Sequence, residues 1–227
     1  TCILQDKSKF RQFLTDHDFN VPHAKGYTKS EDAVKDIDFY HWPVIVKPVD
    51  SAGSKGVTRV DKPEDLPFAI KYALKEGHNG HFIVEDFLEK EGNSSDCDSF
   101  TINGKLVFCS FDDQLFDKGA ANPYTPAAYC WPSTIPAGVQ EELRSELQRL
   151  MTLLNMRTGV YNIETRLCKD GKPYIMEVSP RGGGNRLSEM LKYTTGVDLI
   201  DNAVRAAVGE EVDHLSQPTY KGNWAEI

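Results

Sequence analysis

Two consecutive strand-like segments constrain the fold of this chain more than any other feature of its sequence. Residues 160–167 and 173–178 are rich in β-branched and aromatic side chains, and the turn sequence Lys-Asp-Gly-Lys at residues 169–172 joins them. Apolar runs of this length on both sides of a glycine-containing turn are typical of adjacent antiparallel strands. The sequence therefore predicts a β-hairpin over residues 160–178.

Each strand of this predicted hairpin carries one acidic residue among apolar neighbours, Glu164 in the first and Glu177 in the second. On neighbouring antiparallel strands the two carboxylates could lie side by side and share divalent cations. Carboxylates combined with a substrate's phosphates suit Mg²⁺ better than zinc. The other interpretation is two solvent-facing acids on a half-exposed sheet, which the apolar neighbours make less favourable.

The residue pattern in the rest of the sequence predicts helices that alternate with short strands. Asn103-Gly104 separates two apolar runs, and this pair predicts a tight hairpin because it accepts positive φ angles. Four prolines within residues 123–136 predict an ordered loop. Further strands are predicted over residues 43–48, 56–60 and 81–88, the last running into a polar stretch at 89–95, and helices over 7–19, 65–75, 138–156 and 187–208, with a break at 195–196.

Composition excludes several classes of protein. The 227 residues carry a net charge of −8, which argues against a nucleic-acid partner. No apolar run approaches the roughly 20 residues that a membrane helix requires, so no membrane partner is expected. The five cysteines include no CxxC pair and predict reduced thiols rather than a disulfide framework or a zinc site. No secretion signal opens the sequence, and a cytoplasmic location is the default expectation.

A glycine- and serine-rich segment follows Lys47, which ends a predicted strand. Residues 51–56 read Ser-Ala-Gly-Ser-Lys-Gly, and glycines let backbone amides approach an anion while an ammonium group supplies countercharge. The spacing does not fit the Walker pattern, and a strand rather than a helix follows, so the segment would be a flexible hairpin flap. A plain Gly-Ser turn is the alternative, and this pattern alone does not decide between the two.

A second glycine-rich loop follows Glu177 and begins with Arg181. Residues 181–186 read Arg-Gly-Gly-Gly-Asn-Arg. A guanidinium group near a metal-bound phosphate can hold its oxygens bidentately and stabilise charge that develops during phosphoryl transfer. A flexible connection into the following helix is the alternative, and it is favoured when this loop is considered alone.

In their order along the chain, these segments resemble the ATP-grasp superfamily over nearly the whole sequence. The similar segments are Asp6-Lys7, residues 43–48, 51–57 and 84–88, and residues 164–185. The resemblance implies an α+β fold in which two lobes with antiparallel sheets grip ATP between them. It divides the chain into a leading helix at residues 1–20, a small lobe at 21–88 that carries the flap, and a large lobe at 89–227 that carries the metal carboxylates.

The resemblance also implies roles for individual residues. Glu164 and Glu177 would hold Mg²⁺, with Mn²⁺ as an alternative, and Ser179 stands where the family commonly has an Asn ligand. The ribose contact would come from Asp96, Ser94 or Glu89. The ATP phosphates would be contacted by Lys7 and Lys47, and the lid over them would be formed by Gly53, Ser54 and Gly56. The adenine hinge would be Glu85, Asp86, Phe87 and Leu88. The catalytic residues would be Arg181 and Lys47.

By the same resemblance, the chain would be the core of a ligase that uses Mg-ATP to convert a carboxylate into an acyl phosphate for attack by an amine. Carboxylate-amine ligases and carbamoyl-phosphate-synthetase-like enzymes share this motif order. The alternatives are a carboxylate-thiol ligase and a regulatory nucleotide-binding module without catalysis. The partners expected are a small carboxylate and an amine, with a further N-terminal α/β domain of the same enzyme, and a homodimer is compatible with this pattern.

Overall fold

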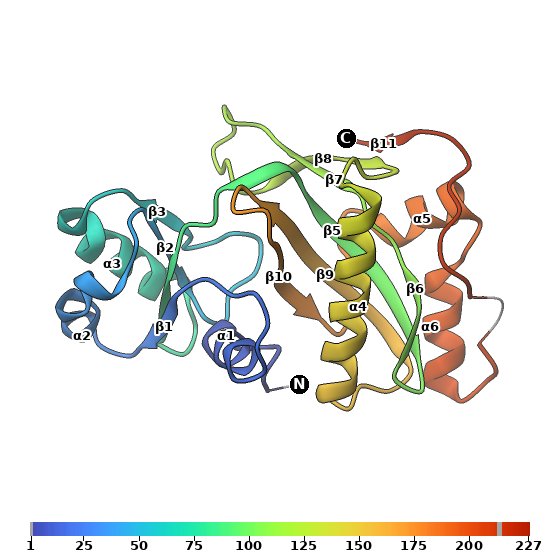
Figure 1. The fold of residues 1–227 in the computed structure, drawn as a ribbon, viewed down its shortest axis with the longest axis horizontal. Helices are drawn as coiled ribbons and strands as arrows, with labels where there is room; N and C mark the ends of the chain where they lie inside the picture. Colours follow the sequence, from blue (N-terminus) through green and yellow to red (C-terminus); the bar gives the residue numbers. More distant parts are fainter. Residues whose placement is uncertain (1, 213–214) are drawn as a thin grey trace. The chain divides into compact units, whose positions relative to one another are not determined.

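The computed structural model describes residues 2–212 and 215–227, and the chain forms two compact units. The first unit comprises Thr1–Glu89 and Lys118–Thr125, and the second comprises Lys90–Asp117 and Pro126–Ile227. In Figure 1 the blue and cyan elements belong to the first unit. The short segment Lys118–Thr125 therefore groups with the N-terminal part of the chain, although it follows the first strands of the second unit in sequence.

The first unit is built on an antiparallel sheet with the strand order β1-β4-β2-β3 in the described residues. The helix α3 covers one face of the sheet, and α1 contacts β1 and β4. The elements are α1 (Lys7–Asp16), β1 (Ala24–Tyr27), α2 (Ser30–Lys35), a 3-10 turn (Ile37–Phe39), β2 (Val44–Pro48), β3 (Thr58–Val60), a second 3-10 turn (Pro63–Asp65), α3 (Leu66–Glu76) and β4 (Phe82–Asp86).

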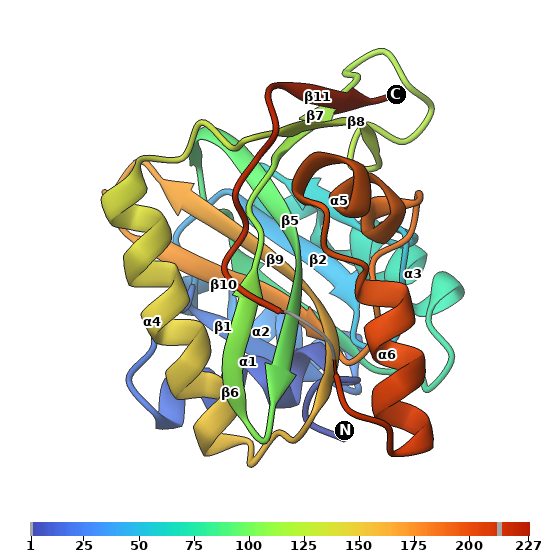
Figure 2. The same ribbon diagram turned by 90° about the vertical axis from the view of Figure 1, so that its right-hand side faces the viewer.

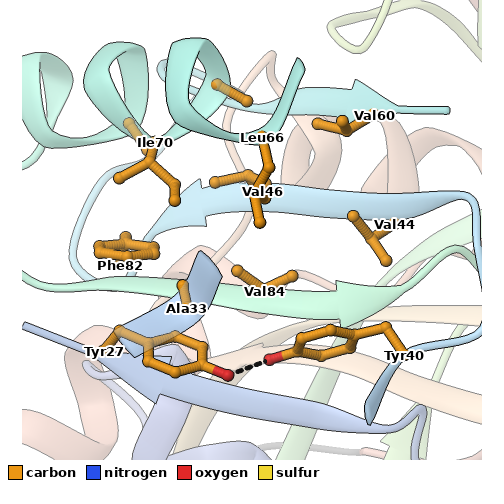
Figure 3. Packing of buried hydrophobic residues seen from close by; sticks show 12 residues of the cluster. Tyr27, Ala33, Tyr40, Val44, Val46, Val60, Leu66, Ile70, Phe82 and Val84 are labelled. Atoms are coloured by element: carbon orange, nitrogen blue, oxygen red, sulfur yellow. Dashed lines mark hydrogen bonds between the residues drawn. The ribbon is translucent and has the colours of Figure 1, made fainter. Parts of the chain in front are cut away.

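Alternation along β2 and β4 separates an apolar face from a charged one. Val46 pairs with Val84, and both are fully buried in the cluster that α3 closes with Leu66 and Ile70 (Figure 3). Successive strand residues point to opposite faces, so the neighbours Lys47 and Glu85 face away from this core. The core thus orients two ionisable side chains toward the other face of the sheet, where α1 lies.

Two local features fix the start of α1 and one edge of the core in this unit. The side chain of Asp6 caps α1 by accepting hydrogen bonds from the amides of Ser8 and Lys9, at 3.0 and 3.1 Å. A hydrogen bond of 2.7 Å between the hydroxyls of Tyr27 and Tyr40 closes the edge of the core (Figure 3). The predicted helix at residues 7–19 is confirmed as far as Asp16.

The second unit contains a larger antiparallel sheet with the order β10-β9-β5-β7-β8-β11, and β6 also pairs with β5. Its elements are β5 (Lys90–Ile102), β6 (Lys105–Cys109), β7 (Asp113–Phe116), β8 (Pro126–Trp131), α4 (Ala137–Leu153), β9 (Gly159–Cys168), β10 (Pro173–Ser179), α5 (Leu187–Thr195), α6 (Leu199–Val208) and β11 (Trp224–Glu226).

Helices cover both faces of this sheet (Figure 2). The helix α4 buries Leu143, Leu147 and Leu150 and contacts β6 and β10. On the opposite face, α5 and α6 pack over Phe100 and contribute buried leucines to the same cluster. No helix in the described part of the chain has the length and apolar composition needed to span a bilayer.

The structure corrects two predicted connections and confirms the predicted hairpins. Residues 126–131 form β8 rather than a loop, because Pro126 is the first residue of the strand, where it pairs with Phe116, and Pro132 follows its end. The polar stretch at 89–95 belongs to β5 from Lys90 onward, since β9 supplies its partner strand. Asn103 and Gly104 form the expected turn with φ angles of 50° and 80°.

Candidate functional site

The two acids of the predicted hairpin lie directly opposite each other on the paired strands β9 and β10. Glu177 pairs with Glu164, while Ile175 pairs with Thr165, so Met176 is an extra residue that forms a bulge. Regular alternation would have placed Met176 opposite Glu164 and turned Glu177 to the other face. The bulge therefore brings the two carboxylates onto one face of the sheet.

The strand β5 adds a third carboxylate to this row. Asp96 pairs with Glu164 from the other side of β9, so three acids occupy adjacent positions on three strands. Two residues further along, Asn162 pairs with both Ser179 on β10 and Asp98 on β5. Because residues i and i+2 share a face, the two rows form one continuous polar surface.

The electrostatics of this polar surface favour a cation. Burial, reinforced by the negative charge of Glu164, raises the pKa of Asp96 to about 7. The amide nitrogen of Asn162 donates to Oδ1 of Asp96 at 2.6 Å and to Oδ1 of Asp98 at 3.1 Å. A set of oxygen donors at adjacent strand positions fits the preference of Mg²⁺ and Mn²⁺ for carboxylate and other oxygen ligands.

Asp98 fixes the glycine-rich loop that follows β10. Its Oδ1 accepts a hydrogen bond from the amide of Gly183 at 2.8 Å, and its Oδ2 accepts one from the hydroxyl of Ser188, on α5, at 2.6 Å. A Cβ atom at Gly183 would lie 2.4 Å from Cδ1 of Leu187, so a larger residue here would require the Leu187 side chain or the loop to shift. The loop is therefore held to β5 and α5 rather than flexible along its whole length.

Arg181 begins this loop and is exposed. Its amide donates to the carbonyl of Ser179 at 2.8 Å, and its Nη1 donates to the carbonyl of Gly182 at 2.7 Å. The positive charge of Arg181 lowers the pKa values of Asp96 and Asp98, opposing the effect of their burial. The guanidinium thus acts electrostatically on the same carboxylates that form the polar surface.

In the first unit, Lys47 belongs to a buried ionic cluster. The Glu85 carboxylate accepts one hydrogen bond from Lys47 and another from Nε of Arg11 at 3.0 Å. Burial lowers the pKa of Lys47, and the positive charges of Arg11 and Lys7 lower it further. Burial raises the pKa of Glu85, but the two cations outweigh that effect and bring it down to about 2. The cluster has more cationic than anionic groups, which favours a further anion beside it.

The predicted flap lies in the same unit as this cluster. Nζ of Lys7 donates to the carbonyl of Ser51 at 2.9 Å, and the hydroxyl of Ser54 donates to the carbonyl of Tyr124 at 3.0 Å. Gly53 and Gly56 have φ angles of 67° and 73°, a left-handed conformation that glycine adopts at little cost. The flap is therefore a turn whose exposed tip, at Ala52 and Gly53, lies between residues that hydrogen bonds hold.

The predicted hinge continues from Glu85. Asp86 ends β4, and its carboxylate accepts hydrogen bonds from both the amide and Nδ1 of His41. The amide of Phe87 donates to the carbonyl of Pro43 at 2.9 Å, and Leu88 is half-buried. The sequence predicted this segment by resemblance, but it did not predict that the Glu85 and Asp86 side chains bind other side chains of the unit.

Each unit thus holds its own set of the predicted residues. The sequence reasoning missed three residues that organise them: Arg11, Asn162 and Asp98. Arg11 lies four residues after Lys7 on α1, a spacing that places both on one helix face, and this spacing was available as a signal. Asn162 lies two residues before Glu164, and Asp98 two after Asp96, so period-two alternation was the available signal for both.

Known proteins resemble this chain in sequence. It is 25% identical over 215 residues to the ATP-grasp enzyme fsqD of Aspergillus fumigatus, covering 80% of this chain and 37% of that protein. It is 22% identical over 213 residues to the carbamoyl phosphate synthase large chain of Ralstonia nicotianae, covering 92% of this chain and 19% of that protein. The chain thus spans well under half the length of these two relatives.

Solved structures share the fold. An L-amino acid ligase from Bacillus licheniformis superposes with a TM-score of 0.71 at 23% identity, covering 91% of this chain and 48% of that one. A biotin carboxylase domain from Hydrogenobacter thermophilus, solved with MgADP, ADP and bicarbonate, gives a TM-score of 0.76 at 18% identity, covering 98% of this chain and 49% of that one.

The chain also matches the sequence profile of a whole protein family. The sequence profile of the ATP-grasp domain matches residues 40–189, a range that begins just after the first 3-10 turn and includes the carboxylate strands and the Arg181 loop. This range covers more than half of the chain and includes Lys47 and Glu85 of the ionic cluster and all the residues of the polar surface. With its antiparallel sheets and helices, this chain belongs to the ATP-grasp family.

Proposed function

We propose that this chain is the core of a Mg-ATP-dependent ligase that phosphorylates a carboxylate and lets an amine attack the acyl phosphate. Carboxylate-amine ligation is the leading reaction, with a carbamoyl-phosphate-synthetase-like reaction as its nearest variant. The observation that carries the proposal is the pairing of Glu164 with Glu177 beside a loop that Asp98 holds in place. This arrangement combines oxygen ligands for a metal with an arginine at the start of the loop.

In this proposal, each unit contributes a distinct part of nucleotide binding. In the first unit, Lys7 and Lys47 provide positive charge for the phosphates, and the backbone of residues 51–56 covers them. The carboxylates of Glu85 and Asp86 already bind neighbouring side chains, and the amides of Asp86 and Phe87 donate to main-chain carbonyls. The hinge at residues 85–88 would therefore contact the adenine through its remaining backbone groups. Asp96 lies beside Glu164, which supports a role near the metal as much as one at the ribose.

The second unit would provide the chemistry of transfer. Glu164 and Glu177 would hold Mg²⁺, which when bound neutralises phosphate charge and orients the transferred group. On β10, Ser179 offers only a hydroxyl where the family commonly has an Asn ligand. Asn162 on β9, which pairs with Ser179, provides an amide side chain at this position. Arg181 would stabilise the charge on the phosphoryl group as it moves from ATP to the carboxylate oxygen, with ADP as the leaving group.

Hydroxylamine provides a direct test of this reaction. The full gene product is incubated with ATP, Mg²⁺ and a panel of carboxylates, and hydroxylamine captures an acyl phosphate as a hydroxamate with release of phosphate. Hydroxamate formation that depends on one carboxylate, together with amine-dependent ADP release, is the expected result. Acceleration by thiols rather than amines would support the carboxylate-thiol alternative. If the protein binds nucleotide but no carboxylate stimulates ADP formation, the result would support the regulatory, non-catalytic alternative.

A further inference from the structure

Two histidines and an aspartate meet at the end of β4, in the first unit and apart from its ionic cluster. The potential ligand atoms of His23, His41 and Asp86 all lie within 4.8 Å of one another. Nδ1 of His41 is 2.8 Å from Oδ2 of Asp86, and Nδ1 of His23 is 3.7 Å from the same oxygen. One carboxylate oxygen therefore lies beside two imidazole nitrogens.

Main-chain hydrogen bonds hold these three residues together. The amide of Asp86 donates to the carbonyl of His23 at 2.9 Å, and the amide of His41 donates to Oδ1 of Asp86 at 3.0 Å. The His23 ring packs near two other rings, with centroid distances of 5.5 Å to Phe39 and 4.7 Å to His41. The positions of His23, His41 and Asp86 are thus fixed by the backbone of β4 and the neighbouring segments, and not by side-chain rotamers alone.

We propose that His23, His41 and Asp86 form a site for a transition-metal dication such as Zn²⁺, Ni²⁺ or Cu²⁺. Around a tetrahedral ion with ligand bonds of about 2.0–2.1 Å, ligand atoms lie about 3.3–3.4 Å apart. The two distances from Oδ2 of Asp86, 2.8 and 3.7 Å, fall on either side of that spacing. The ligand atoms of the two histidines lie within 4.8 Å of each other, so side-chain rotations that shorten this distance would bring all three ligands around one ion. The ion would replace the hydrogen bond between Nδ1 of His41 and Asp86.

The kind of donor determines the kind of ion. Imidazole nitrogens suit zinc, copper and nickel, whereas Mg²⁺ prefers oxygen ligands alone. The side chains of His23 and His41 are 54% and 76% exposed, while that of Asp86 is only 14% exposed. An ion can therefore reach the site from solvent, and water can complete its coordination. This site differs in chemistry from the all-oxygen surface around Glu164.

Binding of an ion would cross-link three segments of the first unit. His23 precedes β1, His41 precedes β2, and Asp86 ends β4. An ion bound only by the folded arrangement stabilises it by mass action, because the unfolded chain does not hold the three ligands together. We therefore expect the ion to raise the melting temperature of the chain without any nucleotide.

Direct binding measurements on the chain, free of any histidine tag, test the proposal. Calorimetry with Zn²⁺ should show one strong site per chain, and Co²⁺ should give the visible absorption of a four-coordinate ion with nitrogen ligands. His41→Gln and Asp86→Asn should each weaken Zn²⁺ binding at least tenfold. His81→Gln removes another exposed histidine of the same unit and should leave binding unchanged.

Two further measurements distinguish a specific metal site from a misfolded variant and from general adsorption of ions at the surface. Circular dichroism of each metal-free variant establishes that it is folded, so that lost binding reports a lost ligand. Mg²⁺ should fail to displace Zn²⁺, because the proposed nucleotide site holds its metal elsewhere. Zn²⁺ binding that is weak and non-saturating, or that His41→Gln and His81→Gln reduce equally, would show that the cluster is only a surface ion pair.

Discussion

Glu177 faces Glu164 across β9 and β10 only because Met176 forms a bulge between Ile175 and Glu177. The bulge shifts the alternation of β10 by one residue, so that Tyr174 and Glu177 share a face although they are three residues apart. Bulges of this kind re-aim side chains, and here the shift joins two carboxylates with Asp96 in one row. The proposed metal site depends on this shift.

Replacing either paired glutamate should remove metal-dependent nucleotide binding. Glu164→Gln and Glu177→Gln keep the shape of the side chain but lose the charge that a divalent cation needs. We expect the melting shift produced by ATP with Mg²⁺ to fall to that seen with ATP and chelator. Glu141→Gln, on the exposed side of α4, serves as the control and should keep the full difference. An unchanged Mg²⁺-dependent shift in both glutamine variants would exclude these residues as ligands.

The loop after β10 should tolerate alanine at Gly184 but not at Gly183. A Cβ at Gly183 would lie 2.4 Å from Leu187 and 2.9 Å from Asn162, whereas a Cβ at Gly184 meets nothing within 4 Å. Overpacking at such a contact costs about 1–3 kcal/mol, so Gly183→Ala should lower the free energy of unfolding by about that amount. Urea denaturation of the two variants measures the difference. Equal stabilities would show that the loop moves freely away from α5.

Arg181→Lys should lower turnover far more than ATP affinity. Lysine keeps the charge but loses the planar fork that binds phosphate oxygens bidentately. We expect kcat to fall by about two orders of magnitude or more while the KM for ATP changes by about threefold or less. Steady-state ADP formation measures both, with Arg186→Lys, an exposed arginine paired with Glu189, as the control. Near-normal turnover in Arg181→Lys and Arg181→Ala would remove its catalytic role.

Glu85 should make the stability of the first unit depend on acid pH. Its folded-state pKa of about 2 lies below the usual value of 4.5, so its contribution is present above the usual value and is lost as the pH falls toward 2. Glu85→Gln leaves Lys47 and Arg11 without their shared carboxylate, which costs about 3–5 kcal/mol at neutral pH. Denaturation between pH 2.5 and 7 should show a flatter profile for Glu85→Gln than for the exposed-residue control Glu64→Gln.

If the two profiles have the same slope, the carboxylate of Glu85 does not supply this pH dependence. A variant that is destabilised at neutral pH but keeps the original slope would indicate a packing defect rather than a lost charge. The two measurements on the same samples therefore distinguish the ionic role of Glu85 from a purely steric one.

The flap at residues 50–57 should exchange its amide hydrogens rapidly in the absence of ligand and slowly with ATP and Mg²⁺. The tip at Ala52 and Gly53 is exposed, while hydrogen bonds of Asp50, Ser51 and Ser54 hold the residues on either side of it. Locally open backbone of this kind has low protection until a ligand orders it. The strand β2, paired on both sides, provides the internal control for slow exchange. Equal exchange of the flap with and without nucleotide would leave it an ordinary hairpin turn.

The sequence by itself determined the local elements of this protein. Apolar runs rich in β-branched residues marked β2 and β9, the Asn103-Gly104 pair fixed the turn between β5 and β6, and leucines at helical spacing marked α4. These signals are readable because they depend on residues close together in the chain. The order of motifs also indicated the family, and with it the candidate residues Glu164, Glu177 and Arg181.

Only the tertiary structure decided which residues meet. The bulge at Met176, the pairing of Asp96 with Glu164 and the bonds of Asp98 to Gly183 and Ser188 join residues up to 90 positions apart. No local period encodes such pairings, because strand register is set by burial of one sheet face and by the helices packed on it. For the same reason, the spacing of Lys7 and Arg11 on α1 does not reveal that Arg11 and Lys47 share the buried carboxylate of Glu85.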